Sequence, residues 1–246
     1  MTAHHPLNLG HRGASSLAPE NTLAAFRLAR EIGADGIEFD VKLSQDGVPV
    51  IMHDDRLERT SNGHGRVDET AWSVLRRLDA GRWFDLRFAG EAIPTLQDVI
   101  DEFGASLLLN IELKASTRGA ELVEQVVACV LRNELAGHVI ISSFDWRLLE
   151  HVRALDPALR VGVLFRQAVS ALEYEALQPD AIHPEQQLMT ASMVAAAHQH
   201  NQAVNTWTVD REDDMLRMIA LGVNAIITNY PQRLKDVMHG LESADL

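Results

Sequence analysis

Two acids and a histidine lie in a stretch of sequence that otherwise has the pattern of β-strands. Residues 35–54 read DGIEFDVKLSQDGVPVIMHD, and Glu38, Asp40 and His53 stand at positions where a strand would normally pack apolar residues. Buried carboxylates are unfavourable unless they are paired or bind a metal ion. Histidine titrates near neutrality and transfers protons readily. These residue types therefore indicate a site with metal-binding and acid–base chemistry.

Alternation along two segments predicts that three carboxylates come together. In residues 36–43 the odd positions are apolar and the even positions include Glu38 and Asp40, and residues 107–114 carry Glu112 on a similar polar face. Side chains two positions apart in a strand point to the same side. Unpaired carboxylates on these faces would repel one another, and their pKa values would rise. A divalent cation relieves this repulsion, and ligands that are all oxygen favour Mg²⁺ or Ca²⁺ over zinc.

Salt bridges are the alternative explanation for these acids. Lys42 and Lys114 lie on the same polar faces. For Glu112 with Lys114 alone, an ion pair is the favoured interpretation. For the whole set of acids together with His53, a functional site is favoured, because burying several acids on two strands is costly without a function.

A tight turn is expected to bring His53 to the acids. Asp46-Gly47 lies between two alternating runs, which is typical of a two-residue hairpin loop. With these residues as the loop, Asp40 faces His53 directly across the hairpin, with Cα atoms about 4.5–5.5 Å apart.

A second pair of candidate residues follows the first strand-like segment. His11-Arg12-Gly13 comes at the end of LNLGH, residues 7–11. A planar guanidinium suits a phosphate group, and a histidine can transfer a proton. Taken alone, a surface His-Arg pair is the commoner explanation of this motif.

The elements that must position these residues alternate regularly along the chain. The predicted strands are residues 7–11, 36–43, 107–114, 138–144, 160–165, 181–184, 203–209 and 225–229, with 48–53 as an extra strand. About eight strand–helix repeats in ~250 residues are typical of a TIM barrel, whose active sites lie at the C-terminal ends of the strands. A doubly wound open sheet is the alternative. Residues 54–94 break the rhythm and are predicted to be a small insertion after the second strand, within a single domain of residues 1–246.

The composition limits the classes of function. The chain has 246 residues, of which 46% are hydrophobic, and a formal net charge of −13. This charge argues against nucleic-acid binding, which needs a basic surface, and an anionic substrate needs a local positive charge. A single cysteine, the lack of a long apolar run and an N-terminus without a signal-peptide pattern predict a cytoplasmic protein with no stable membrane association.

Several longer motifs follow one another along the chain. They are HRGASSLAPENTLAAF, GIEFDVKLSQDGVPVIMHDDRLERTSNGHG, LDAGRWFDLRFAGEAIPTL, NIELK, NTWTVD and AIITNYP. Together they resemble the glycerophosphodiester phosphodiesterases, and the likeness is closest to the short bacterial cytosolic members. The resemblance runs from residue 7 to about residue 231, and its most specific part is the spaced set HRG, ENT, ExD, HD and ExK.

The resemblance implies a TIM barrel with a small insertion after the second strand and a bound divalent cation, Mg²⁺ or Ca²⁺. The residues that match the metal ligands of the family are Glu38, Asp40 and Glu112. His11 and His53 match its acid–base pair, and we assign His11 as the base and His53 as the acid.

Four further positions match residues that contact the substrate in the family. The resemblance implies that Arg12 and Lys114 contact the phosphate and that Phe144 and Trp207 line the substrate pocket.

Two positions depart from the family pattern. Asn229 stands where the family usually has Asp, and Asp210 stands where Asn is common. Both are expected to cap the helices that follow them, a role that either residue can fill, and not to touch the proposed chemistry.

The predicted function is metal-dependent hydrolysis of a small-molecule glycerophosphodiester to glycerol 3-phosphate and an alcohol. One histidine would remove a proton from the nucleophile and the other would donate a proton to the leaving alkoxide. The nucleophile is either water or the adjacent glycerol hydroxyl, through a cyclic phosphate. A phospholipase-type phosphodiesterase on the same barrel and a non-catalytic phosphodiester-binding protein are the alternatives. The sequence leaves the head group, the metal and the oligomeric state open.

Overall fold

Eight parallel strands form a closed barrel in residues 5–244, the part of the chain that the computed structural model describes. These strands are β1 (Leu7–His11), β2 (Gly36–Leu43), β4 (Leu108–Leu113), β5 (Val139–Ser143), β6 (Val161–Phe165), β7 (Ala181–Pro184), β8 (Ala203–Thr206) and β9 (Ala225–Thr228). Each pairs with the next in this order, and β9 pairs with β1 to close the sheet. The predicted TIM barrel is confirmed. Residues 1–4 and 245–246 of the predicted domain lie outside the described residues, and the single-domain assignment stays a prediction.

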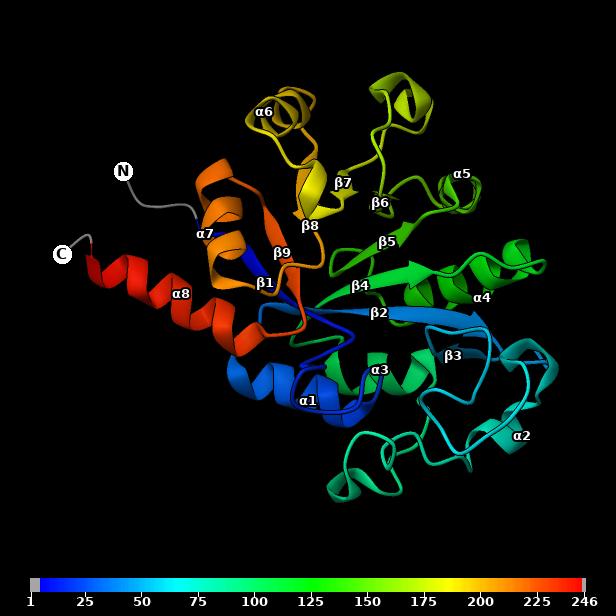
Figure 1. The fold of residues 1–246 in the computed structure, drawn as a ribbon. Helices are drawn as coiled ribbons and strands as arrows, with labels where there is room; N and C mark the ends of the chain where they lie inside the picture. The colour runs from blue at the N-terminus through cyan, green and yellow to red at the C-terminus, as the bar shows by residue number, and fades with distance from the viewer. Residues whose placement is uncertain (1–4, 245–246) are drawn as a thin grey trace.

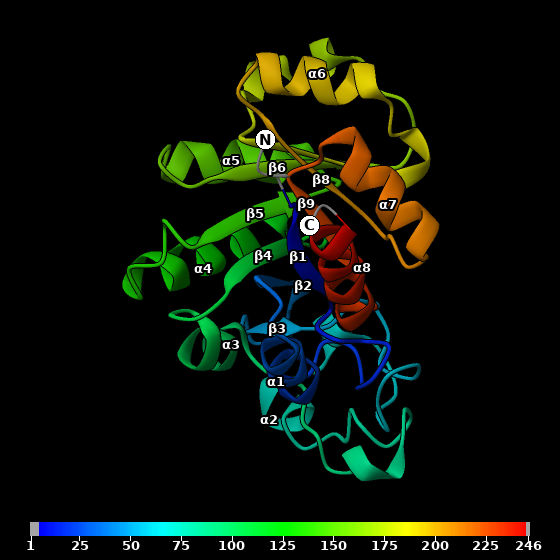
Figure 2. The same ribbon diagram turned by 90° about the vertical axis from the view of Figure 1, so that its left-hand side faces the viewer.

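Helices surround the barrel (Figure 1; Figure 2). They are α1 (Leu23–Ile32), α2 (Trp72–Leu75), α3 (Leu96–Phe103), α4 (Gly119–Arg132), α5 (Trp146–Leu155), α6 (Ala191–Gln199), α7 (Glu212–Leu221) and α8 (Pro231–Ala244). Between β6 and β7 the chain forms only two short 3₁₀ segments, Ala171–Glu173 and Glu175–Leu177. The strand–helix repeat is therefore incomplete at this one connection.

Local sequence signals fix α1 against the barrel. Thr22 caps its N-terminus by accepting a hydrogen bond from the backbone N–H of Ala25, and Gly33 ends it with a left-handed φ of 88°. The buried Phe26 packs on Phe39 of β2 and on Phe103 of α3, with ring centroids 5.6 and 5.9 Å apart. This packing holds the loop between β1 and α1 beside the C-terminal end of β2.

The hairpin between β2 and β3 (Pro49–Ile51) has a different register from the predicted one. Val41 pairs with Ile51, and the backbone N–H of Met52 donates to the carbonyl of Asp40 at 3.0 Å. The loop has three residues and ends at Gly47, whose φ of 81° is left-handed, as in a type I turn followed by a bulge. The expectation that Asp40 faces His53 directly is therefore wrong by one residue. His53 instead follows the end of β3, outside the ladder.

The segment from 54 to 94 has little regular structure. It contains α2 and two 3₁₀ segments, Val67–Glu69 and Leu86–Phe88. Its buried side chains form a second hydrophobic cluster with β3, which includes Leu57, Val67 and Leu75. Figure 1 shows the cyan part of this segment beside the arrowhead of β2 and its green part below α1 and α3. Within residues 5–244, no helix has the length and apolar character needed to cross a membrane.

Candidate active site

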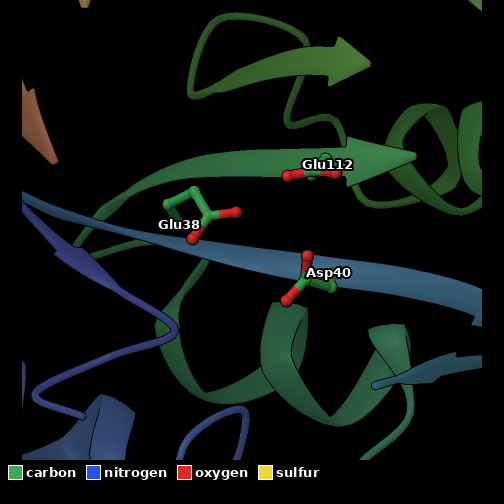
Figure 3. A group of neighbouring side chains, drawn as sticks. All are labelled: Glu38, Asp40 and Glu112. Carbon is green, nitrogen blue, oxygen red and sulfur yellow. The ribbon is translucent and has the colours of Figure 1, made fainter. Parts of the chain in front are cut away.

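Three buried carboxylates lie together near the C-terminal ends of β2 and β4. Glu38, Asp40 and Glu112 are 4%, 1% and 8% exposed, and each offers an oxygen within 4.8 Å of the others. The register of the sheet explains this cluster, because Asp40 is the direct neighbour of Glu112 across the two strands. Figure 3 shows the three carboxyl groups gathered at adjacent parts of β2 and β4. Such all-oxygen donors can hold a divalent cation.

The electrostatics of the cluster suit a cation. Burial raises the pKa of Glu38 well above its ordinary value, and the carboxylates of Asp40 and Glu112 raise it further. Burial and Asp40 raise the pKa of Glu112 in the same way. Burial also opposes ionisation of Asp40, but the Lys114 and Arg12 cations keep its pKa below the ordinary value. With all three carboxyl groups ionised, the cluster would carry one more negative charge than Arg12 and Lys114 neutralise, and a divalent ion would favour this ionised state. These residues therefore fit a divalent ion.

Two basic side chains reach the carboxylates from the ends of β1 and β4. Nη1 of Arg12 lies 2.7 Å from Glu20, and its Nε lies 3.2 Å from Asp40. Nζ of Lys114 lies 2.6 Å from Glu112 and 3.2 Å from Asp40. The ion pair expected as an alternative for Lys114 is thus present within the acidic cluster and does not replace it.

A sharp backbone turn directs Arg12 toward these acids. Arg12 and Gly13 both have left-handed φ angles, 56° and 85°, and the backbone N–H of Arg12 donates to the carbonyl of Glu38 at 2.8 Å. A Cβ atom at Gly13 would lie 2.7 Å from the backbone of Ala25 in α1. The glycine of the HRG motif is therefore required by the close approach of this turn to α1.

His11 hydrogen-bonds to a residue that follows β9. Its Nδ1 lies 2.7 Å from Oδ1 of Asn229, and Nδ2 of Asn229 donates to Asp210 at 2.7 Å. Because an amide oxygen only accepts, Nδ1 of His11 carries the proton and Nε2 is unprotonated, 3.8 Å from a carboxylate oxygen of Glu38. Burial, and then the Arg12 charge, lower the pKa of His11 to about 4. The imidazole is therefore neutral at neutral pH.

The expected capping role of Asn229 and Asp210 is wrong. The side chain of Asp210 accepts hydrogen bonds from Thr228 and Asn229 at the end of β9, and the residue at the cap of α7 is Arg211. Asn229 contacts His11 directly. The two positions expected to depart from the family pattern are thus hydrogen-bonded to each other.

His53 is held by a carboxylate. Its Nδ1 lies 2.6 Å from Asp54, and hydrogen bonds from Arg59 lower the pKa of Asp54. An ionised Asp54 accepts the Nδ1 proton, which leaves Nε2 of His53 available. Arg59 also donates to Glu20 at 2.7 and 2.8 Å, and Glu20 accepts from Arg12. One ion-pair network therefore connects the insertion, His53 and the loop after β1.

One cavity of about 100 Å³ is lined by every predicted site residue except Asp40, which is buried and ion-paired with Arg12 and Lys114. Phe144 and Trp207 form one wall as a T-shaped pair, with ring centroids 5.4 Å apart and an interplanar angle of 88°. The indole N–H of Trp207 donates to the carbonyl of His183 at 2.8 Å, which fixes the orientation of this ring. The fold thus brings the predicted acids, histidines, cations and aromatic residues to a single cavity.

Comparison with known proteins gives the family. The sequence matches a model of the Glycerophosphoryl diester phosphodiesterase family over residues 11–233. This chain belongs to that family. The glycerophosphodiester phosphodiesterase of Caldanaerobacter subterraneus subsp. tengcongensis is 39% identical to it, over 93% of this chain and 96% of that protein. The glycerophosphodiester phosphodiesterase of Bacillus subtilis is 31% identical, over 95% of this chain and 87% of that protein.

A solved structure agrees with this family assignment. The Oleispira antarctica phosphodiesterase, in complex with the product sn-glycerol-3-phosphate, is 33% identical and superposes with a TM-score of 0.89, over 96% of this chain and 97% of that chain. The family and the enzyme class predicted from the motifs are therefore confirmed.

Sequence reasoning missed the residues that orient the two histidines. They are Glu20, Asp54, Arg59, Asp210 and Asn229. All five lie within the longer motifs of the chain, and Asp54 directly follows His53. The contact of Arg59 with Glu20 carried no signal in the sequence, since it joins residues that are 39 positions apart.

Proposed function

We propose that this chain hydrolyses glycerophosphodiesters to glycerol 3-phosphate and an alcohol, with the help of a bound divalent cation. One observation carries the proposal: two histidines, each held at Nδ1 by a hydrogen bond, line the same cavity as the buried acidic cluster. The names of the relatives and the product in the Oleispira antarctica structure support the substrate class.

The acidic cluster would hold the cation, Mg²⁺ or Ca²⁺, through Glu38, Asp40 and Glu112. When bound, such a cation polarises phosphoryl oxygens and offsets the negative charge that develops on them. Arg12 and Lys114 line the cavity beside these acids, where their N–H groups can donate to the phosphate oxygens.

The hydrogen-bond partners of the two histidines support different roles. His11 donates Nδ1–H to a neutral amide, so its unprotonated Nε2 is suited to remove a proton from the attacking water or glycerol hydroxyl. His53 donates to an ionised carboxylate, which favours a protonated imidazole that can donate to the leaving alkoxide. This contact acts against burial, which lowers the pKa of His53 in the absence of a ligand. Phe144 and Trp207 would form an apolar wall for the glycerol part of the substrate.

Release of glycerol 3-phosphate from glycerophosphocholine tests this proposal. We expect turnover in the presence of Mg²⁺ or Ca²⁺, loss of turnover with a chelator, and recovery when the metal is restored. His11→Ala and His53→Ala should each lower kcat by about 10²–10⁴-fold with an unchanged circular dichroism spectrum. His64→Ala, in an exposed turn of the insertion, is the matched control.

The same assay separates the alternatives. Wild-type kcat in both histidine variants at saturating metal would show that the acid–base assignment is wrong. Binding of the diester without turnover would favour a non-catalytic binding protein. Faster turnover of intact phospholipids than of glycerophosphocholine would favour a phospholipase-type enzyme. Cytoplasmic location and the lack of stable membrane association stay predictions.

A further inference from the structure

Arg166 lies at the wall of the active-site cavity without having been predicted as a site residue. It directly follows β6, its side chain is exposed, and it lines the cavity together with both histidines and the aromatic pair. Its guanidinium carbon lies 4.6 Å from the ring centroid of Phe144 and 5.8 Å from that of Trp207. These distances are those of cation–π contacts, so two rings position the guanidinium.

The charge of Arg166 is not neutralised by an acid. The other two cations that line the cavity, Arg12 and Lys114, are both ion-paired with carboxylates. Within residues 5–244, the side chain of Arg166 has no hydrogen bond and no carboxylate within 4.0 Å, and its guanidinium makes cation–π contacts with the two rings. Its N–H donors are therefore available to a ligand, in a protein with a net charge of −13.

The position of Arg166 indicates which part of a substrate it meets. A wider groove of about 560 Å³ opens beside the inner cavity. The residues that line both spaces are His53, Glu112, Lys114, Phe144 and Arg166. In a glycerophosphodiester, the phosphate lies between the glycerol and the second alcohol. A substrate that places one alcohol in each space therefore places its phosphate at the boundary, beside Arg166.

We propose that Arg166 is a phosphate-binding residue that holds the phosphodiester of the substrate and the phosphate monoester of the product; this inference rests on the proposed function. A guanidinium suits this task because its planar fork matches phosphate oxygens. The cation–π contacts with the two rings hold the guanidinium in place without an acid that competes with the ligand. Arg166 thus supplies the local positive charge that an acidic protein needs in order to bind an anion.

Binding and kinetics of Arg166→Gln test the inference. Titration calorimetry at a fixed Mg²⁺ concentration should give a Kd for glycerol 3-phosphate that is about tenfold weaker than in the wild type, the size expected for a lost charge-assisted hydrogen bond. Glycerol binding should be unchanged. The KM for glycerophosphocholine should rise by about tenfold with kcat within about threefold, because the contact is made in both ground state and transition state.

Two further variants separate charge from general effects. Arg166→Lys should recover most of the affinity for glycerol 3-phosphate. Arg147→Gln removes an equal charge from a side chain that is 85% exposed and lines neither space, and it should match the wild type. The inference is overturned if Arg166→Gln changes neither Kd nor KM by more than twofold, or if glycerol binding weakens as much as glycerol 3-phosphate binding. A wild-type protein that neither binds glycerol 3-phosphate nor hydrolyses the diester would refute the proposed function itself.

Discussion

The hydrogen-bonded pair of Asp210 and Asn229 offers a sharp test of how His11 is held. The Nδ2 of Asn229 donates to a carboxylate oxygen of Asp210 at 2.7 Å, while its Oδ1 accepts from His11. Asn229→Asp replaces the donor by a second carboxylate at that distance. Asp210→Asn together with Asn229→Asp restores one acid and one amide, in the order expected from the family resemblance.

The size of the effect follows from the contact distance. Two carboxylates at 2.7 Å repel by about 6 kcal/mol at an effective dielectric constant of about 20. Protonation of one carboxyl group costs less free energy than this repulsion, because an ordinary Asp with a pKa near 4 takes up a proton at pH 7 for about 4 kcal/mol. Both residues are half-buried, so water reduces this figure, and we expect Asn229→Asp to lose about 2–4 kcal/mol of stability at pH 7.

The sign of the pH dependence distinguishes this mechanism from simple loss of packing. The shared proton raises the folded-state pKa above the unfolded value, so the deficit is small near pH 4 and grows as the pH rises. Urea unfolding at pH 5 and pH 7 measures it, with the double variant as the control that should return to within about 1 kcal/mol of the wild type. A deficit that does not change with pH, or a double variant as unstable as Asn229→Asp alone, would refute this reasoning.

Three other substitutions test separate parts of the structure. Asp54→Asn should lower kcat by about 10–100-fold in the glycerophosphocholine assay, with unchanged calorimetric metal affinity, because His53 loses the ionised partner of its Nδ1; unchanged kcat would contradict this. Burial lowers the pKa of His183 to about 3, so this residue takes up a proton in the unfolded chain, but not in the folded one, as the pH falls below about 6.5. Between pH 6.5 and pH 4.5 the wild type should therefore lose up to about 2.7 kcal/mol more stability than His183→Asn. Equal slopes for the two proteins in urea unfolding would argue against a buried neutral imidazole. Gly13→Ala should lower stability by about 2–4 kcal/mol, because its Cβ would meet the backbone of Ala25 at 2.7 Å; a thermal midpoint equal to that of the wild type would count against the required turn.

The strand pattern was predictable because parallel barrel strands are buried on both faces. β1, β2 and β7 have the bounds expected from the sequence, and the other barrel strands differ by a few residues at their ends. The clustering of Glu38, Asp40 and Glu112 was also predictable, since alternation decides which side chains share a face. The register of the hairpin could not be predicted, because a two-residue loop and a three-residue loop both place Gly47 in a left-handed turn. The two loops differ by one residue in the pairing of β2 with β3, and the structure has the three-residue loop.

The supports of the histidines could not be read from the sequence for a different reason. Asn229 reaches His11 across 218 positions, and only closure of the barrel makes β9 a neighbour of β1. Arg166 was equally hidden, because an arginine after a strand is ordinary until the two rings beside it are known. Long-range partners of this kind follow from the closed topology and not from local patterns.

Anomalous diffraction from crystals soaked in Mn²⁺, which shares the oxygen ligands of Mg²⁺, tests the central claim most directly. We predict one strong peak about 2.0–2.6 Å from a carboxylate oxygen of each of Glu38, Asp40 and Glu112, and its loss in Glu38→Gln. A peak held by other residues, or one that persists unchanged in Glu38→Gln, would contradict the assignment of these three buried acids as a metal site.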